Sequence, residues 1–440
     1  MSTIKGFSKL SRTDKIAWLA KHFLTSNPLD IAREFSSFMH NSAETQRLFD
    51  GISENTLTNF YMPYGVAPNF VINGRAYVIP MVIEESSVVA AAASGAKFWS
   101  ERGGFNAEVV STKKVGHVHF IWSGDGDALV EFFNSTKQIL KDGVKDLIAN
   151  MEARGGGLLD IELIDCTHLE DDYYQLKGTF ETCDAMGANF INSVLEEFAR
   201  ILESEIAVYP IFSGRERSVE IVMSILSNYT PESLVKAWVE CPVEQLGAFD
   251  DAGLDAKRFA KRFTTAVKIA NVDPSRATTH NKGIFNGIDA VVLATGNDFR
   301  AIEACGHTYA ARNGSYSSLT KASVKEGIFR FEIEIPLAVG TVGGLTRLHP
   351  LSKRSLEMLG NPSARDLMKI MACVGLSQNF AAVKALVTSG IQKGHMKMHL
   401  TNILNHFNAT EKEIERAIQY FADKTVSHSG VRDYLFKIRG

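Results

Sequence analysis

The chain has 440 residues, of which 45% are hydrophobic and 22% are charged, and its formal net charge at pH 7 is -3. This composition is ordinary for a soluble globular protein, and the near-neutral charge argues against a surface built to bind nucleic acid. Since one hydrophobic core rarely extends over so many residues, two or three domains are expected.

The cysteines and the N-terminus bear on cellular location. The five cysteines are scattered, odd in number and without CxxC spacing, which argues against a disulfide framework or a structural zinc site: Cys166, Cys183, Cys241, Cys305 and Cys373. The first residues lack the apolar stretch of a signal peptide, and no run approaches the roughly 18 apolar residues of a spanning helix. We therefore predict a cytoplasmic protein that contacts neither a membrane nor nucleic acid.

The first hundred residues change from helical to extended patterns and back. Apolar residues at helical spacing predict short surface helices over the first fifty residues. The segment from Phe70 to Val82 is extended and is broken at Asn73-Gly74, which favours a tight hairpin turn. An alanine-rich helix is predicted from Ser86 to Trp99, and its small side chains would let another helix approach closely.

A compact α/β domain is predicted over residues 112–227, inserted within a larger domain. Its elements alternate as strand, helix, strand, strand, helix and strand, the order of a split βαβ sandwich. The predicted segments are strands at 113–122, 158–163, 173–180, 206–212 and 218–226, with helical stretches up to Ala153 and from about Asp184. The strands at 206–212 and 218–226 are expected to be joined by a turn at Ser213-Gly214.

The larger domain resumes after this insertion. We expect helices near residues 231–238 and 256–270, a buried apolar strand at 288–294, a tight turn at 340–344, and helices over the last sixty residues. Thr410 and Glu413 have the spacing of a capping box at a helix start.

Standard catalytic and nucleotide motifs are missing from the chain. There is no GxSxG, GxxxxGK[ST], HExxH or GxGxxG pattern, so a Rossmann cofactor site has no support. Glu84 and Glu85 precede the alanine-rich helix, where carboxylates often complement the helix dipole. Because adjacent residues of an extended segment point opposite ways, at most one of them should face a site.

Four other polar clusters each allow a structural and a functional interpretation. Residues 279–283 suggest a loop in which Lys282 is either solvated or donates hydrogen bonds to a developing oxyanion. In residues 296–300, Asp298 fits a helix N-cap. Residues 184–189 could bring a helix start close to a phosphate or pack tightly against another element. His395 and His399 have helical spacing, but without further ligands a metal is disfavoured, and a single histidine acting as general acid fits better.

Together these stretches resemble the 3-hydroxy-3-methylglutaryl-coenzyme A (HMG-CoA) reductase family, most closely its bacterial class II branch, over nearly the whole chain. The matching segments occur in family order: 54–55, 80–91, 184–189, 276–286, 294–298, 340–344 and 394–396. The stretches Asp184-Ala185-Met186-Gly187 and Thr279 to Gly283 are highly specific. Two departures from the family pattern are Ser86, where class II members usually have proline, and Thr56 to Thr58, where a glycine is common.

The resemblance implies roles for individual residues. The implied catalytic set is Glu85 (rather than Glu84), Lys282, Asp298 and His395, with Asp298 linking Glu85 to Lys282. The implied substrate-binding residues are Ser87, Asn228, Arg276 and Asn286. The implied cofactor-binding residues are Asp184, Met186, Gly187 and Asn189, and no metal is expected.

The resemblance also implies a fold and a reaction. The expected α+β fold has a large mixed α/β HMG-CoA-binding domain (1–111 and 228–378), an inserted ferredoxin-like nicotinamide-binding domain (112–227) and a helical C-terminal flap (379–440). HMG-CoA would be reduced to mevalonate and coenzyme A, with NADPH favoured and NADH open. A homodimer with its active site at the interface is expected, and higher assemblies stay open. The alternatives are degradative oxidation of mevalonate with NAD and coenzyme A, and a non-catalytic scaffold that binds coenzyme A or a nucleotide.

Overall fold

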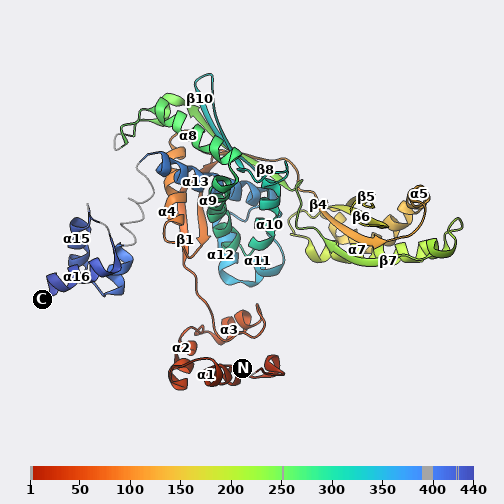
Figure 1. Ribbon diagram of the computed structural model, residues 1–440, viewed down its shortest axis with the longest axis horizontal. Helices are drawn as coiled ribbons and strands as arrows, with labels where there is room; N and C mark the ends of the chain where they lie inside the picture. Colours follow the sequence, from red (N-terminus) through yellow and green to blue (C-terminus); the bar gives the residue numbers. More distant parts are fainter. Residues whose placement is uncertain (1–2, 250–251, 389–399, 423, 425) are drawn as a thin grey trace.

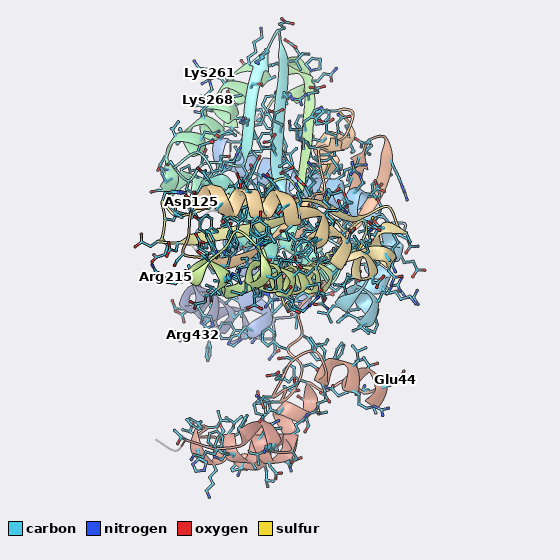
Figure 2. The ribbon with its side chains drawn as sticks, turned by 90° about the vertical axis from the view of Figure 1, so that its right-hand side faces the viewer. Glu44, Asp125, Arg215, Lys261, Lys268 and Arg432 are labelled. Carbon is cyan, nitrogen blue, oxygen red and sulfur yellow. The ribbon has the colours of Figure 1, made fainter. Side chains whose placement is uncertain are left out.

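The computed structural model describes residues 3–249, 252–388, 400–422, 424 and 426–440. Figure 1 shows a central body, a smaller α/β unit beside it, and helical units at the two chain ends that lie apart from the body. In Figure 2 the smaller unit faces the viewer, and the N-terminal helices, with Glu44 on α3, lie below the body. The predicted α+β class is confirmed by this mixture of separate sheets and helices.

The central body is built on an antiparallel sheet and a group of packed helices. The sheet has the order β3 (Asn106–Val109), β8 (Leu234–Pro242), β10 (Ile328–Pro336), β9 (Thr320–Lys325). The helices are α4 (Val88–Ser100), α8 (Ala256–Val272), α9 (Pro274–Ala294), α10 (Phe299–Ala310), α11 (Gly344–Leu348), α12 (Pro350–Met358) and α13 (Ala364–Val387), with the short η3 (Val243–Leu246).

The predicted hairpin and the close approach to the alanine-rich helix are both confirmed. Strands β1 (Tyr64–Ile72) and β2 (Arg75–Val82) meet at Asn73 and Gly74, whose φ angles of 48° and 79° are those of a tight hairpin turn. On α4, a Cβ at Gly95 would lie 2.5 Å from the Ser377 Oγ of α13. The small residue therefore lets the two helices touch.

The smaller unit has the predicted βαββαβ order. Its elements are β4 (Lys114–Ile121), α5 (Gly126–Gly143), α6 (Lys145–Glu152), β5 (Gly157–Asp165), β6 (Tyr173–Glu181), α7 (Ala188–Val208), η2 (Gly214–Arg217) and β7 (Glu220–Leu226). The strands form an antiparallel sheet in the order β5-β6-β4-β7, and the helices pack on it around a separate hydrophobic core.

The two chain ends form small helical units. The N-terminal unit contains η1 (Phe7–Lys9), α1 (Arg12–His22), α2 (Pro28–Ser37) and α3 (Ala43–Asp50), as the sequence predicted. The C-terminal unit contains a helix that includes residues 400–406, then α15 (Glu411–Tyr420) and α16 (His428–Arg439). The capping box of Thr410 and Glu413 is confirmed at the start of α15.

Two element predictions were wrong in the segments that flank β7. Residues 206–212, expected as a strand, contain the end of α7 and a turn, because buried residues recur at helical spacing along α7 up to Ile206. Residues 231–238, expected as a helix, lead into strand β8, where Val235, Ala237 and Val239 alternate with less buried residues. Pairing of β8 with both β3 and β10 overrides its local helical pattern.

Two further predictions failed for helices buried in the core. The apolar run at 288–294 is the last part of α9, because a helix buried on most sides loses the periodicity that distinguishes it from a strand. Helix α13 is long and apolar enough to cross a membrane, contrary to the prediction that no such run exists. Since 72% of its apolar 18-residue window is buried inside the structure, α13 is a central core helix.

Candidate active site

Lys282 lies in the middle of a continuous helix. The predicted loop at 279–283 is wrong: α9 runs for 21 residues, starting with Asp273 as N-cap and Pro274 in its first turn. Polar residues at 279–283 mimic a loop in the sequence, but two of them, His280 and Asn281, are buried against the core. Lys282 itself faces outward from the same turn of helix.

A buried polar network fixes this turn of α9. The His280 Nε2 lies 2.6 Å from the Thr320 Oγ1, and the Asn281 amide donates to the Ser317 carbonyl at 2.9 Å. The Asn379 amide donates to the His280 carbonyl at 3.1 Å. Burial, assisted by the nearby Arg276 charge, lowers the pKa of His280 to about 3, so this histidine stays neutral and serves as an anchor.

Glu85 and Lys282 meet across the structure. The Lys282 Nζ donates to the Glu85 Oε2 at 3.0 Å, although the two residues are 197 positions apart in the chain. Their side chains are 38% and 62% exposed respectively, so the pair is open to a ligand. Glu84 is exposed, whereas Glu85 is partly buried in the segment between β2 and α4. The structure therefore supports the choice of Glu85 over Glu84.

The predicted substrate residues are spread around this pair and at the junction between the body and the smaller unit. Asn286 lies one turn after Lys282 on the same face of α9, and Arg276 lies in the first turns of that helix. Burial lowers the pKa of Arg276. Ser87 is the N-cap of α4 and makes no side-chain capping bond. Asn228 is exposed and lies just after β7.

Asp298 is the N-cap of α10. Its carboxylate accepts from the backbone N–H groups of Arg300 and Ala301, and it forms a two-bond ion pair with the Arg300 guanidinium, at 2.9 and 2.7 Å. The Arg300 hydrogen bond holds the pKa of Asp298 below its usual range. Within the described residues no hydrogen bond joins Asp298 to Glu85 or Lys282, and that link stays a prediction.

The turn at residues 184–187 joins the smaller unit to the body. The Asp184 carboxylate accepts from the Ala364 backbone N–H at 2.7 Å, at the N-terminus of α13, where a negative charge is favourable. The Asp184 carbonyl accepts from the Thr341 N–H at 2.8 Å, and Ala185 forms a parallel bridge with Val342. The Asp184 side chain is therefore engaged by the body of the protein.

Asn297 extends this contact toward α10. Its side-chain oxygen accepts from the Gly340 N–H at 2.8 Å, and its amide donates to the Thr295 Oγ1 at 3.1 Å. The predicted tight turn at 340–344 therefore lies between the start of α10 and the turn at 184–187. The turn at 340–344 therefore connects the start of α10, which Asp298 caps, to the turn that carries the predicted cofactor residues.

The start of α7 can receive an anionic or amide group. Gly187 is its N-cap with φ of 90°, and a Cβ there would lie 2.4 Å from Thr182 Cγ2. No side chain caps the helix, so N–H groups of its first turn, near the exposed Asn189, are available. Met186 lines a small cavity together with Asn228, which places a predicted cofactor residue beside a predicted substrate residue.

Lys114 is a candidate site residue that the sequence analysis did not select. It is buried beneath the turn at 184–187, where its Nζ donates to the Ala185 carbonyl at 2.8 Å and to the Thr182 Oγ1 at 2.5 Å. Burial lowers its pKa to about 8. The available signal was a lysine at the start of a strand whose alternate residues are apolar. Lys114 also lines the cavity that contains Met186 and Asn228.

The fourth predicted catalytic residue, His395, lies outside the described residues, as does His399. Among the residues that the structure describes, no group of three His, Cys, Asp or Glu side chains could hold a metal ion.

Known proteins share both the sequence and this fold. The family model for hydroxymethylglutaryl-coenzyme A reductase matches residues 14–400. The 3-hydroxy-3-methylglutaryl-coenzyme A reductase of Archaeoglobus fulgidus is 36% identical over 433 residues, which are 95% of this chain and 90% of that protein. A probable reductase of the same name from Borreliella burgdorferi is 34% identical over 397 residues, covering 88% and 87%.

Solved structures agree. A class II 3-hydroxy-3-methylglutaryl-CoA reductase from Streptococcus pneumoniae, bound to NADPH in open conformations, superposes with a TM-score of 0.71 at 36% identity, covering 88% of this chain and 100% of that one. A second structure of the reductase from this organism gives a TM-score of 0.72 at 34% identity, covering 99% and 100%. The chain therefore belongs to the hydroxymethylglutaryl-coenzyme A reductase family.

Proposed function

We propose that this chain reduces HMG-CoA to mevalonate and coenzyme A with two molecules of NADPH, and that Glu85 and Lys282 form its reaction centre. The 3.0 Å contact between their side chains carries the proposal, because it joins two residues that the family resemblance assigns to catalysis. The NADPH-bound relative from Streptococcus pneumoniae supports the reductive direction over oxidation of mevalonate.

Lys282 is the electrostatic partner of the reacting oxygen. Reduction of the thioester carbonyl, and later of the aldehyde, places negative charge on an oxygen atom, which a fixed ammonium group stabilises. The buried network around His280 and Asn281 holds the lysine's turn of helix in place. Because this positioning exists before the reaction, little reorganisation is needed when charge develops.

Glu85 would deliver a proton to the aldehyde oxygen after its carboxylate, which accepts from the Lys282 ammonium in the structure, has taken one up. Its hydrogen bond to Lys282 places a carboxyl group beside the ammonium that faces the same oxygen. Asn286 and Arg276 on α9, Ser87 on α4 and Asn228 near the smaller unit would hold the substrate around this pair. Each presents a hydrogen-bond donor suited to the carboxylate, hydroxyl or carbonyl oxygens of HMG-CoA.

The residues at the start of α7 would hold the cofactor. Met186, Gly187 and Asn189 lie at an uncapped helix N-terminus, and Asp184 keeps their turn against the body. When bound there, the nicotinamide supplies hydride. Gly187 has a positive φ, and a Cβ there would meet the Thr182 side chain, so the glycine allows the turn that presents the N–H groups of this helix N-terminus.

Further features support the remaining expectations. His395, in the predicted C-terminal flap, would protonate the leaving thiolate of coenzyme A. A homodimer is supported by exposed apolar side chains near the N-terminus, where Leu29 on α2 is 68% exposed and Phe60, between α3 and β1, is 91% exposed in the single chain. The burial of α13 supports a core helix rather than a membrane span.

The direct test measures stoichiometry. Purified protein given HMG-CoA and NADPH is expected to oxidise two NADPH for each coenzyme A thiol released, measured by nicotinamide absorbance and a thiol reagent. Oxidation of one NADPH with accumulating mevaldehyde would contradict the four-electron reaction. Binding of NADPH without thiol release would indicate a scaffold instead.

Replacing Glu85 with glutamine is expected to lower kcat by at least about a hundredfold, because the amide can still accept from Lys282 but cannot donate an acidic proton. The measurement is steady-state NADPH oxidation at saturating substrates. Glu84→Gln is the matched control and should keep kcat within about twofold, since Glu84 is exposed beside the site. Equal losses in both variants would remove the distinction between the two glutamates.

Replacing Lys114 with methionine is expected to weaken NADPH binding about tenfold, because the turn at 184–187 loses two buried hydrogen bonds. Fluorescence titration of NADPH measures the effect. Lys113→Met is the control, since Lys113 is exposed and pairs with Glu232 at 3.3 Å. The same loss in both variants would show that general charge, rather than support of the turn, is responsible.

A further inference from the structure

Two acidic side chains meet between α9 and α10. Asp289 of α9 is hydrogen-bonded to Glu303 of α10. The Asp289 Oδ1 atom is buried and has no hydrogen-bond partner in the described part of the chain. Asp289 and Glu303 are both partly buried, and His307 and Tyr316 are the ionisable side chains that interact with Glu303. None of the proposed catalytic steps uses it.

The pair lies along the face of α9 that carries the reaction centre. Lys282, Asn286 and Asp289 are spaced by four and three residues, so all three project from one side of the helix. Helix α10 packs along the adjoining side, where the rings of Phe285 and His307 lie 4.6 Å apart. Asp289 and Glu303 therefore connect the helix that bears Lys282 to the helix that Asp298 caps.

We propose that Asp289 and Glu303 share one proton and act as a clamp that positions α9, with Lys282, against α10, with Asp298. This inference rests on the proposed function, because it gives the clamp a role in HMG-CoA reduction. Asp289 and Glu303 are positioning residues, which act through the helices that carry Lys282 and Asp298.

The shared proton follows from the charges around the pair. Two carboxylates in contact within a buried site cannot both ionise without strong repulsion, so one keeps its proton and donates to the other. Burial, and then the Glu303 charge, raises the pKa of Asp289 to about 8. The other ionisable groups that interact with Glu303 are His307 and Tyr316, whose side chains lie 2.7 Å apart. Burial lowers the pKa of His307, so this neutral ring offers no positive charge to a second carboxylate.

The clamp makes both stability and turnover sensitive to alkaline pH. Since the pKa of Asp289 is raised from 3.8 to about 8 in the folded protein, the native state holds a proton that the unfolded chain releases. The contribution of Asp289 to the free energy of unfolding therefore falls as pH rises from about 4 to about 8, and this contribution is constant above pH 8. Above about pH 8 the two negative charges repel, and α9 shifts relative to α10.

The experiment compares Asp289→Asn and Glu303→Gln with the wild type. Each variant keeps a hydrogen bond between the helices but removes one of the two acidic groups, so neither can develop the second charge. For both, the ratio of variant kcat to wild-type kcat is expected to rise about fivefold between about pH 7 and pH 9. The difference in melting temperature, variant minus wild type, should rise over about pH 5 to 8. Asp142→Asn, whose carboxylate pairs with Lys145, should leave both profiles flat.

Three outcomes separate the possibilities. Flat kcat ratios for both carboxyl variants, in an active enzyme, would overturn the clamp as a positioning device even if the melting temperatures move, since that result describes a purely structural pair. Flat melting differences would overturn the shared proton itself. A wild type that is folded but releases no thiol from HMG-CoA would overturn the proposed function instead, and the melting series would still test the proton.

Discussion

Replacing Lys282 with alanine is expected to lower kcat between about a hundredfold and a thousandfold while the protein stays folded. The loss arises because no other cation of the described site lies within hydrogen-bonding distance of Glu85, so the developing oxyanion keeps no fixed positive partner. Stability should change by less than about 0.5 kcal/mol, because the lysine side chain is 62% exposed and alanine favours the helix.

The measurement pairs steady-state turnover with thermal melting. Lys268→Ala on α8, an exposed lysine of another helix (Figure 2), is the matched control and should keep full activity. A Lys282→Ala enzyme that retained more than about a tenth of wild-type kcat would show that the oxyanion is stabilised elsewhere. A large fall in melting temperature would show that the lysine has a structural role.

Replacing Gly340 with alanine is expected to weaken NADPH binding by at least about tenfold and to destabilise the fold by about 1–3 kcal/mol. The new Cβ would lie 2.6 Å from the Met186 backbone nitrogen and 3.1 Å from the Ala185 carbonyl carbon. Backbone atoms cannot rotate away as a flexible side chain can. Relief therefore requires the turn at 184–187 to move, which breaks the 2.8 Å bond from the Thr341 N–H to the Asp184 carbonyl.

Titration with NADPH and melting curves check this result together. Gly51→Ala is the control, because a Cβ there would meet only carbonyl oxygens at 3.5 and 3.6 Å, which is ordinary contact. Wild-type affinity in Gly340→Ala would mean that the turn can shift without loss of cofactor binding. That outcome would show that the turn at 340–344 does not support the proposed cofactor site.

The sequence predicted correctly those elements whose conformation depends on neighbouring residues in the chain. Asn73-Gly74 specified the hairpin because both positions need positive φ, and the small side chains of α4 anticipated its contact with α13. The prediction failed where tertiary packing decides the structure. Helix α9 was divided into a loop and a strand, because its polar turn at 279–283 is buried in a hydrogen-bond network and its apolar end is enclosed on most sides.

The residues of the candidate site also fall into those that the sequence predicts and those that only the fold reveals. The family resemblance predicts Glu85 and Lys282 as catalytic residues, and the fold brings their side chains into contact. Lys114 and Asp289 were not predicted, because a lysine in a strand and an aspartate in an apolar run gain their properties from residues elsewhere in the chain. Lys114 depends on Thr182 and Ala185, and Asp289 depends on Glu303.

The position of the Asp184 carboxylate has a consequence for protein engineering. Although Asp184 lies in the turn proposed to hold the cofactor, its side chain binds the first turn of α13, and its carbonyl accepts from the Thr341 N–H. A transplant of the smaller unit from a related enzyme, made to alter nicotinamide preference, must therefore carry matching residues at 340–342 and 364. Chimeras designed from domain boundaries alone would place a foreign turn against these body residues, and α13 would lose its acidic cap wherever the donor unit lacks a carboxylate at position 184.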